Sequence, residues 1–193
     1  MGKTRARADL FGILKARLDG IALLLDEMDE SASERLTQAV LSAERVFVTG
    51  KGRSGYVAEC LAMRLMQMEF DVHVVGEATC PRIKSGDLML AISCSGTTTS
   101  TVQFAHISRD SGARVIAVTA VADSPLALLA HEVVLLPVTG RDVKKRYRYV
   151  LGPYNNTLFE EALLLYFDAM VYTILERQGI SKKVLSERHT NLE

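Results

Sequence analysis

The stretch Asp87-Leu-Met-Leu-Ala-Ile-Ser-Cys-Ser-Gly-Thr-Thr-Thr-Ser100 joins an uninterrupted apolar run to a run of small hydroxylated residues. The apolar part shows no polar alternation, which is typical of a parallel strand that helices cover on both faces. A helical apolar periodicity follows the hydroxylated part. A polar turn at a helix N-terminus can bind an anion, because the backbone N–H groups there lack helical partners and the helix dipole is positive there. The stretch therefore predicts an α/β fold with an anion site, although Ser and Thr are also ordinary helix caps.

A second turn of similar chemistry lies earlier in the chain, at Gly50-Lys-Gly-Arg-Ser-Gly55. It follows a short apolar segment at 45–49 and precedes a segment with helical periodicity at 56–68. Glycines permit a tight turn and a close approach of the backbone to a ligand, and Ser54 stands where the helix begins. Gly52 and Ser54 are therefore candidate phosphate contacts.

The rest of the chain alternates between strand-like and helix-like segments. Strands are expected at 45–49, 71–76, 88–92, 114–119 and 132–138, the last at a sheet edge because it contains Pro137. Helices are expected at 8–28, from a capping box Ser31–Glu34 onward, and at 157–178, with shorter ones between the strands. The pattern predicts an α/β protein with a five-stranded parallel sheet flanked by helices on both faces, as in flavodoxin. With the strand order 2-1-3-4-5, the two polar turns meet at the carboxyl edge, where such sheets bind ligands.

Length and composition limit the possible classes of protein. The 193 residues, 48% of them hydrophobic, predict a single domain over 1–193, with an N-terminal helical arm at about 1–43 and an α/β core at about 44–193. Lys plus Arg and Asp plus Glu each number 23, so no overall field favours nucleic acid or an anionic membrane. No apolar run approaches a membrane span and the start does not look like a signal peptide, which predicts a cytoplasmic protein. The three scattered cysteines predict free thiols and no metal site.

A long stretch at 139–156 carries five Lys and Arg residues and several tyrosines without a regular apolar pattern. A stretch of this length inside a compact domain is usually functional or disordered. Because the chain as a whole is charge-balanced, we expect a mobile cover over the site or an intersubunit contact rather than a nucleic-acid site.

The two polar turns, Gly50 to Gly55 and Ser93 to Thr98, resemble the paired phosphosugar loops of the sugar isomerase (SIS) domain family. Within that family, several segments are similar to the 6-phospho-3-hexuloisomerases: AMRLMQ at 62–67, VVGEATCP at 74–81, SGDLMLAIS at 85–93, DSPLA at 123–127, LFEEALLLYFDA at 158–169 and RHTNLE at 188–193. The resemblance covers about residues 45–193. The chain departs from it at Thr97, where many SIS loops have Glu, at Cys94, and in the GPYNN segment before Thr157.

The resemblance implies an isomerase that interconverts 3-hexulose 6-phosphate and fructose 6-phosphate, in formaldehyde fixation or pentose supply. It implies no metal and no cofactor, and a homo-oligomer that is typically a tetramer. It implies phosphate contacts at Ser54, Ser93, Ser95 and Thr98, and a catalytic base at Glu160.

The residues leave the catalytic assignments open. A single positioned carboxylate suits a carbonyl shift through an enediol, but Thr157-x-x-Glu160 also fits a capping box. His189 is a second catalytic candidate and, being close to the chain's end, could reach a neighbouring subunit's site. Glu161 lies about 100° around the helix from Glu160 and is expected in solvent. Arg64 is a candidate for a contact with phosphate or with a carboxylate.

Three other functions remain as alternatives. The glycine turn has the form GxGxxG after a strand, and Glu77 stands where a ribose-binding acid would, so a dinucleotide-binding module is one. A sugar-phosphate sensor without catalysis is another. The third is an isomerase that acts on a different sugar phosphate.

Overall fold

A computed structural model describes residues 9–138 and 156–192. It contains a five-stranded parallel sheet in the order β2-β1-β3-β4-β5. The strands are β1 (Val46–Thr49), β2 (Val72–Val74), β3 (Leu88–Ile92), β4 (Arg114–Thr119) and β5 (Glu132–Leu135). The predicted order, the parallel sheet and the edge position of the last strand are confirmed. The last strand, however, ends at Leu135, before Pro137, whose missing N–H prevents it from continuing the ladder.

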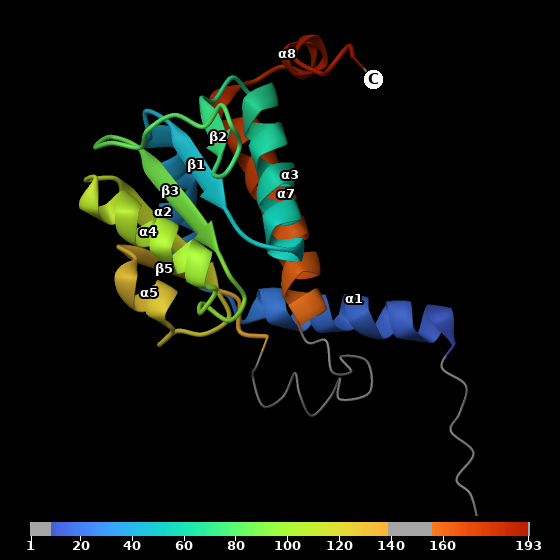
Figure 1. The fold of residues 1–193 in the computed structure, drawn as a ribbon. Coiled ribbons are helices and arrows are strands. Elements are labelled where there is room, and N and C mark those ends of the chain that lie inside the picture. Colours follow the sequence, from blue (N-terminus) through green and yellow to red (C-terminus); the bar gives the residue numbers. More distant parts are fainter. Residues whose placement is uncertain (1–8, 139–155, 193) are drawn as a thin grey trace, which may run out of the picture.

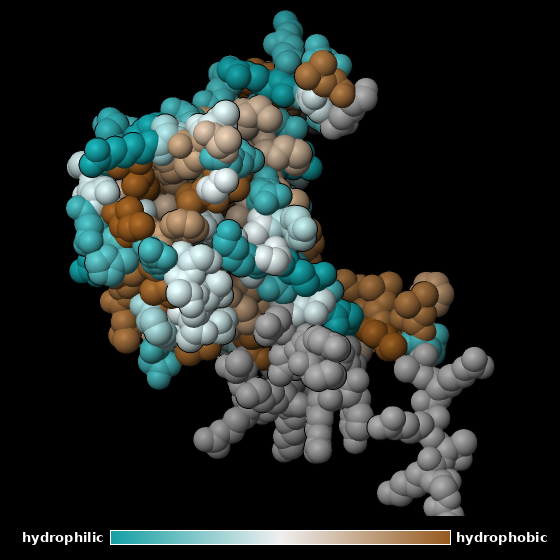
Figure 2. Space-filling view, in the orientation of Figure 1, coloured by the Kyte–Doolittle hydropathy of each residue, from teal (hydrophilic) through white to brown (hydrophobic). Residues whose placement is uncertain are grey.

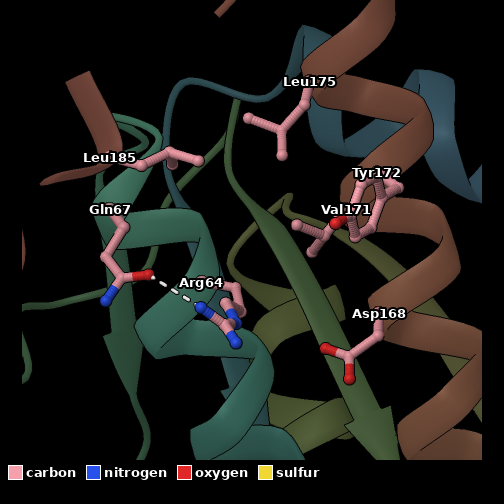
Figure 3. Close-up of a pocket in the computed structure, with 7 residues that line it drawn as sticks. All are labelled: Arg64, Gln67, Asp168, Val171, Tyr172, Leu175 and Leu185. Atoms are coloured by element: carbon pink, nitrogen blue, oxygen red, sulfur yellow. Dashed lines mark hydrogen bonds between the residues drawn. The ribbon is translucent and has the colours of Figure 1, made fainter. Parts of the chain in front are cut away.

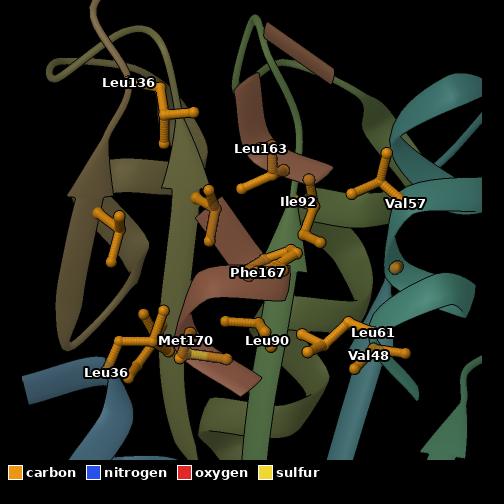
Figure 4. Packing of buried hydrophobic residues seen from close by; sticks show 14 of the residues in the cluster. Leu36, Val48, Val57, Leu61, Leu90, Ile92, Leu136, Leu163, Phe167 and Met170 are labelled. Atoms are coloured by element: carbon orange, nitrogen blue, oxygen red, sulfur yellow. The ribbon is translucent and has the colours of Figure 1, made fainter. Parts of the chain in front are cut away.

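Helices cover both faces of the sheet (Figure 1). One face carries α2 (Glu30–Ser42), α3 (Arg53–Gln67) and α7 (Asn156–Gln178), and the other carries α4 (Thr99–Asp110) and α5 (Pro125–Leu129). β3 is buried along its whole length, as its apolar run predicted. Leu163 and Phe167 of α7 pack over Leu90 and Ile92 of β3 (Figure 4). Because α3 and α4 leave β1 and β3 toward opposite faces, the turns before them meet at one edge.

The two ends of the described chain lie far apart. α1 (Leu10–Asp26) contacts the body through its second half, where Gly20, Ile21 and Leu24 are buried, and projects from it as an arm (Figure 1). α8 (Lys182–Glu187) lies at the end of the molecule opposite to the carboxyl edge of the sheet (Figure 1). The first helix thus both packs on the body and extends beyond it.

Two predictions need correction or remain outside the structure. α2 begins at Glu30 with Asp29 as its N-cap, and the Asp29 carboxylate accepts a 2.8 Å hydrogen bond from Ser31 N. The predicted capping box from Ser31 is therefore wrong, because an Asp two residues earlier already supplies the acceptor. The predictions for 139–155 concern residues outside those described.

No disulfide joins Cys60, Cys80 and Cys94, all of which lie within the described residues. Along 9–138 and 156–192, none of the helices combines the length and the apolar character that crossing a membrane requires.

Candidate functional site

The turns after β1 and β3 line one cavity of about 220 Å³ at the carboxyl edge of the sheet. The cavity brings together four of the five predicted phosphate contacts and the predicted base. Its lining residues are Lys51, Arg53, Ser54, Ile92, Ser93, Cys94, Ser95, Thr98 and Glu160. Gly52, the fifth predicted contact, is exposed beside Arg53 and is not part of the lining.

The first turn depends on two glycines. A Cβ on Gly50 would lie 2.8 Å from backbone atoms of Ser54, so only glycine lets α3 begin this close to the end of β1. Gly52 is the N-cap of α3 with φ 58°, a conformation that favours glycine. Since glycine has no side chain, no cap competes with a ligand for the first N–H groups of α3.

In the second turn the hydroxyl groups bond to one another. Ser93 Oγ and Thr98 Oγ1 are 2.9 Å apart, and Ser93 Oγ also accepts from Gly96 N at 3.1 Å. Ser95 Oγ and Thr97 Oγ1 are likewise 2.9 Å apart. Thr98 is the N-cap residue of α4 but its side chain makes no cap hydrogen bond. The explanation that these hydroxyls merely cap the helix does not hold for Thr98.

The helices away from the cavity show the opposite behaviour. The side chains of their N-cap residues accept backbone hydrogen bonds, at Asp9, Asp29, Ser124 and Ser181. Among the described N-caps, those of α3 and α4 alone leave the first turn without a side-chain acceptor. Two uncapped helix N-termini that meet at one cavity form a site for an anion such as phosphate.

Glu160 of α7 faces the same cavity and is 5% exposed. Ser54 Oγ donates to its Oε1 at 3.0 Å, and Arg53 Nε lies 3.6 Å from its Oε2. Within the described residues Oε2 has no hydrogen-bond partner. Burial raises the pKa of Glu160, and the bond from Ser54, its own N–H and Arg53 offset only part of that increase. A buried carboxylate with a raised pKa and one oxygen that accepts no hydrogen bond is suited to accept a proton.

The capping-box alternative does not describe the Glu160 side chain. α7 begins at Asn156, so Thr157 already lies within the helix, and the carboxylate bonds to a residue of another helix.

Two basic residues of the lining, Lys51 and Arg53, were not among the predicted site residues. Both stand at x positions of the GxGxxG turn, where the pattern allows any residue. Their place within this turn was the signal that could have identified them. Cys94 also lines the cavity, and burial together with the charge of Glu160 raises the pKa of its thiol to about 12. At neutral pH this thiol is protonated, which argues against a role as a nucleophile.

Two further candidates lie elsewhere. His189 follows α8 at the far end of the molecule, is exposed, and places Nδ1 3.3 Å from Thr190 O. Arg64 lines a separate cavity of about 200 Å³ between α3, α7 and α8, where it donates to Gln67 at 3.3 Å (Figure 3). It therefore does not contact the phosphate turns in this chain. Glu161, which was expected in solvent, is only partly exposed, because it forms an ion pair with Arg17 of α1.

In the described ranges, no group of three or more His, Cys, Asp and Glu side chains is arranged to hold a metal ion.

Comparison with known proteins places the chain among phosphosugar-related proteins. A family model described as SIS domain matches residues 40–143. The 3-hexulose-6-phosphate isomerase of Mycobacterium gastri is 36% identical over 182 residues, covering 91% of this chain and 90% of its own length. That of Bacillus subtilis is 32% identical, covering 90% of this chain and 97% of its own. A Methanococcus jannaschii protein, whose crystal structure infers a 3-hexulose-6-phosphate isomerase function, aligns with a TM-score of 0.81 and 29% identity, covering 93% of this chain and 98% of that one.

Proposed function

Because this chain belongs to the SIS domain family, we propose that it is a phosphosugar isomerase that interconverts 3-hexulose 6-phosphate and fructose 6-phosphate. Relatives that align along about nine-tenths of the chain are named 3-hexulose-6-phosphate isomerase. The observation that carries the proposal is the Glu160 carboxylate, whose Oε2 accepts no hydrogen bond from the described residues, in the cavity where the uncapped N-termini of α3 and α4 meet. A sensor without catalysis would need only the phosphate turns, and would gain nothing from an incompletely bonded buried carboxylate.

The phosphate group is proposed to bind where the two turns meet. The first-turn N–H groups of α3 and α4 are donors, including those of Arg53 and Ser54, and the hydroxyls of Ser93, Ser95 and Thr98 add further ones. Arg53 and Lys51 contribute positive charge at the same cavity.

Glu160 is proposed to transfer the proton. It removes the proton from C2 of the 3-ketose, which gives an enediolate across C2 and C3, and returns a proton to C3 while the O2 hydroxyl hydrogen moves to O3. The product is the 2-ketose, with no net gain or loss of atoms. The neighbouring guanidinium of Arg53 favours the developing negative charge.

His189 is proposed to act in the site of another copy within a homotetramer. In its own chain it follows α8, at the end opposite to the cavity. Large apolar side chains are exposed along α1, where Figure 2 shows a hydrophobic surface on the projecting arm, and also on α3 and α7. They are Leu10, Phe11, Leu14 and Leu18 of α1, Met63 of α3, and Leu165 and Tyr172 of α7. Apolar surface of this extent favours association. If His189 acts in trans, mixing inactive His189→Ala and Glu160→Gln protomers restores part of the activity, and no recovery in mixed tetramers contradicts the proposal.

A cytoplasmic location and a role in formaldehyde fixation or pentose supply complete the proposal. The three cysteines form no disulfide with one another, which favours a reducing compartment.

The test is an assay of the purified protein with 3-hexulose 6-phosphate, following fructose 6-phosphate, with other sugar phosphates and NAD as alternatives. We expect turnover of the hexulose phosphate and a loss of about 10³-fold in kcat for Glu160→Gln, with phosphosugar binding retained. Turnover of a different sugar phosphate alone would contradict the substrate assignment, and undiminished turnover in the variant would remove Glu160 from the mechanism.

A further inference from the structure

Arg17 of the projecting helix α1 forms an ion pair with Glu161, the residue that follows the proposed base Glu160. Arg17 Nε lies 3.2 and 2.9 Å from the two carboxylate oxygens of Glu161, and Nη2 lies 2.6 Å from Oε2. The side chains are 18% and 32% exposed, so the pair is partly shielded from water. A guanidinium that holds a carboxylate by parallel bonds fixes its direction as well as its distance.

Arg17 lies where the exposed part of the arm ends. Residues 10–15 of α1 are all exposed, and Ala16 and Arg17 are the first that are not. On the other helix, Glu161 lies in the second turn of α7, which begins at Asn156 after the residues that are not described. The ion pair therefore joins the base of the arm to the first part of the helix that carries Glu160.

A second arginine–glutamate pair provides a natural comparison. Arg177, near the other end of α7, bonds to both carboxylate oxygens of Glu34 on α2 at 2.7 and 2.8 Å. Both pairs tie α7 to an N-terminal helix by the same chemistry. They differ in place, because Glu161 adjoins Glu160 whereas Arg177 is 17 residues further along the chain, nearly five helical turns away.

We propose that Arg17 is a positioning residue for the reaction, which through Glu161 fixes the rotation of the first turns of α7 and so the direction of the Glu160 carboxylate. This inference rests on the proposed isomerase function. Leu158 and Phe159 bury the other side of the same turns in the core. They hold the helix against the sheet, but apolar packing is less directional than a two-point ion pair. A displacement of the base by about 1 Å can cost on the order of 10²-fold in rate.

The test compares Arg17→Ala with Arg177→Ala in the full-length protein. We expect Arg17→Ala to lower kcat about 10-fold with KM changed less than about twofold, since the phosphate turns are untouched. Arg17→Lys keeps the charge but cannot bond to both carboxylate oxygens in the same way, and its kcat is expected to lie between those of Arg17→Ala and the wild type. The exchange Arg17→Glu with Glu161→Arg is expected to restore most of the lost kcat. Arg177→Ala removes a more exposed ion pair, and it is expected to lower stability no more than Arg17→Ala does and to leave kcat unchanged.

The inference is overturned if Arg17→Ala and Arg177→Ala have equal kcat, or if Arg17→Ala changes KM alone. Absence of turnover in the wild type would instead contradict the proposed function. In that event the carboxyl ¹³C signal of Glu160, assigned by its loss in Glu160→Gln, still tests the coupling. A shift in Arg17→Ala but not in Arg177→Ala supports the inference, and no shift in either overturns it.

Discussion

Two carboxylates are buried at opposite edges of the sheet, and their surroundings differ. Asp87, 2% exposed, precedes β3 at the amino edge, and Glu160, 5% exposed, lies at the carboxyl edge. Asp87 accepts from Arg45 Nε at 2.9 Å and Nη2 at 2.6 Å, and from Lys84 N at 2.8 Å. Glu160 has one hydrogen bond, from Ser54, and its second oxygen has none in the described chain.

The pKa values of the two groups move in opposite directions. Burial acts to raise the pKa of Asp87, but the bonds from Arg45 and Lys84 N outweigh it and lower the pKa. At Glu160 burial prevails and the pKa rises. A fully bonded buried carboxylate stabilises the fold, whereas an incompletely bonded one retains the capacity to accept a proton. By this comparison, Asp87 has a structural role and Glu160 is suited to proton transfer.

Exchanging each acid for its amide should lower kcat in one variant and the free energy of unfolding in the other. Glu160→Gln is expected to lose about 10³-fold in kcat, equivalent to about 4 kcal/mol, without loss of unfolding free energy because it removes a buried charge. Asp87→Asn is expected to keep kcat and to lose about 3 kcal/mol of unfolding free energy, because the Arg45 guanidinium loses the carboxylate that it is hydrogen-bonded to. Urea unfolding and the isomerase assay measure the two effects. A large kcat loss in Asp87→Asn would break the contrast.

A matched pair of glycines extends the comparison to the two edges. Gly96 at the carboxyl edge and Gly86 at the amino edge both have positive φ, 64° and 90°. A Cβ on Gly96 would lie 2.0 Å from Oγ of the buried Ser124, whereas one on Gly86 would meet the exposed carboxylate of Glu44, which can move. Gly96→Ala is expected to cost more than about 2 kcal/mol and to raise KM, and Gly86→Ala about 1 kcal/mol with KM unchanged. Thermal unfolding and KM measurements check both, and equal costs would contradict this explanation.

The pH dependence of stability should carry opposite signs for the two acids. The pKa of Asp87 is below its ordinary 3.8 in the folded protein, so its stabilisation is present above about pH 4 and is lost as the pH falls through the folded pKa. The pKa of Glu160 is above its ordinary 4.5, so stability declines as the pH rises from 4.5 through the folded pKa. Urea midpoints measured from about pH 3 to about pH 8 should show a smaller acid loss in Asp87→Asn and a smaller decline in Glu160→Gln. Parallel curves for both variants and the wild type would contradict the assignment.

The sequence predicted the elements most reliably where a single local rule governs them. The apolar run of β3 required burial on both faces, and the alternation of strands with helices required a parallel sheet. The start of α2 was predicted wrongly because Asp29 and Ser31 are both good caps, and local sequence does not rank them. The ion pair of Glu161 was not predicted for a different reason. Its partner Arg17 is 144 residues away, and no local pattern connects them.

By itself, the sequence determined the parallel α/β class, the two polar turns and the glycines that let them form, because each depends on residues a few positions apart. The tertiary structure alone decided that Ser54 donates to one oxygen of Glu160, while the other accepts no hydrogen bond from the described residues and lies near Arg53. It also decided that α3 and α4 begin without side-chain caps and that Arg17 forms an ion pair with Glu161 of α7. These features depend on distances between segments far apart in the chain, and such distances arise only when the layers pack.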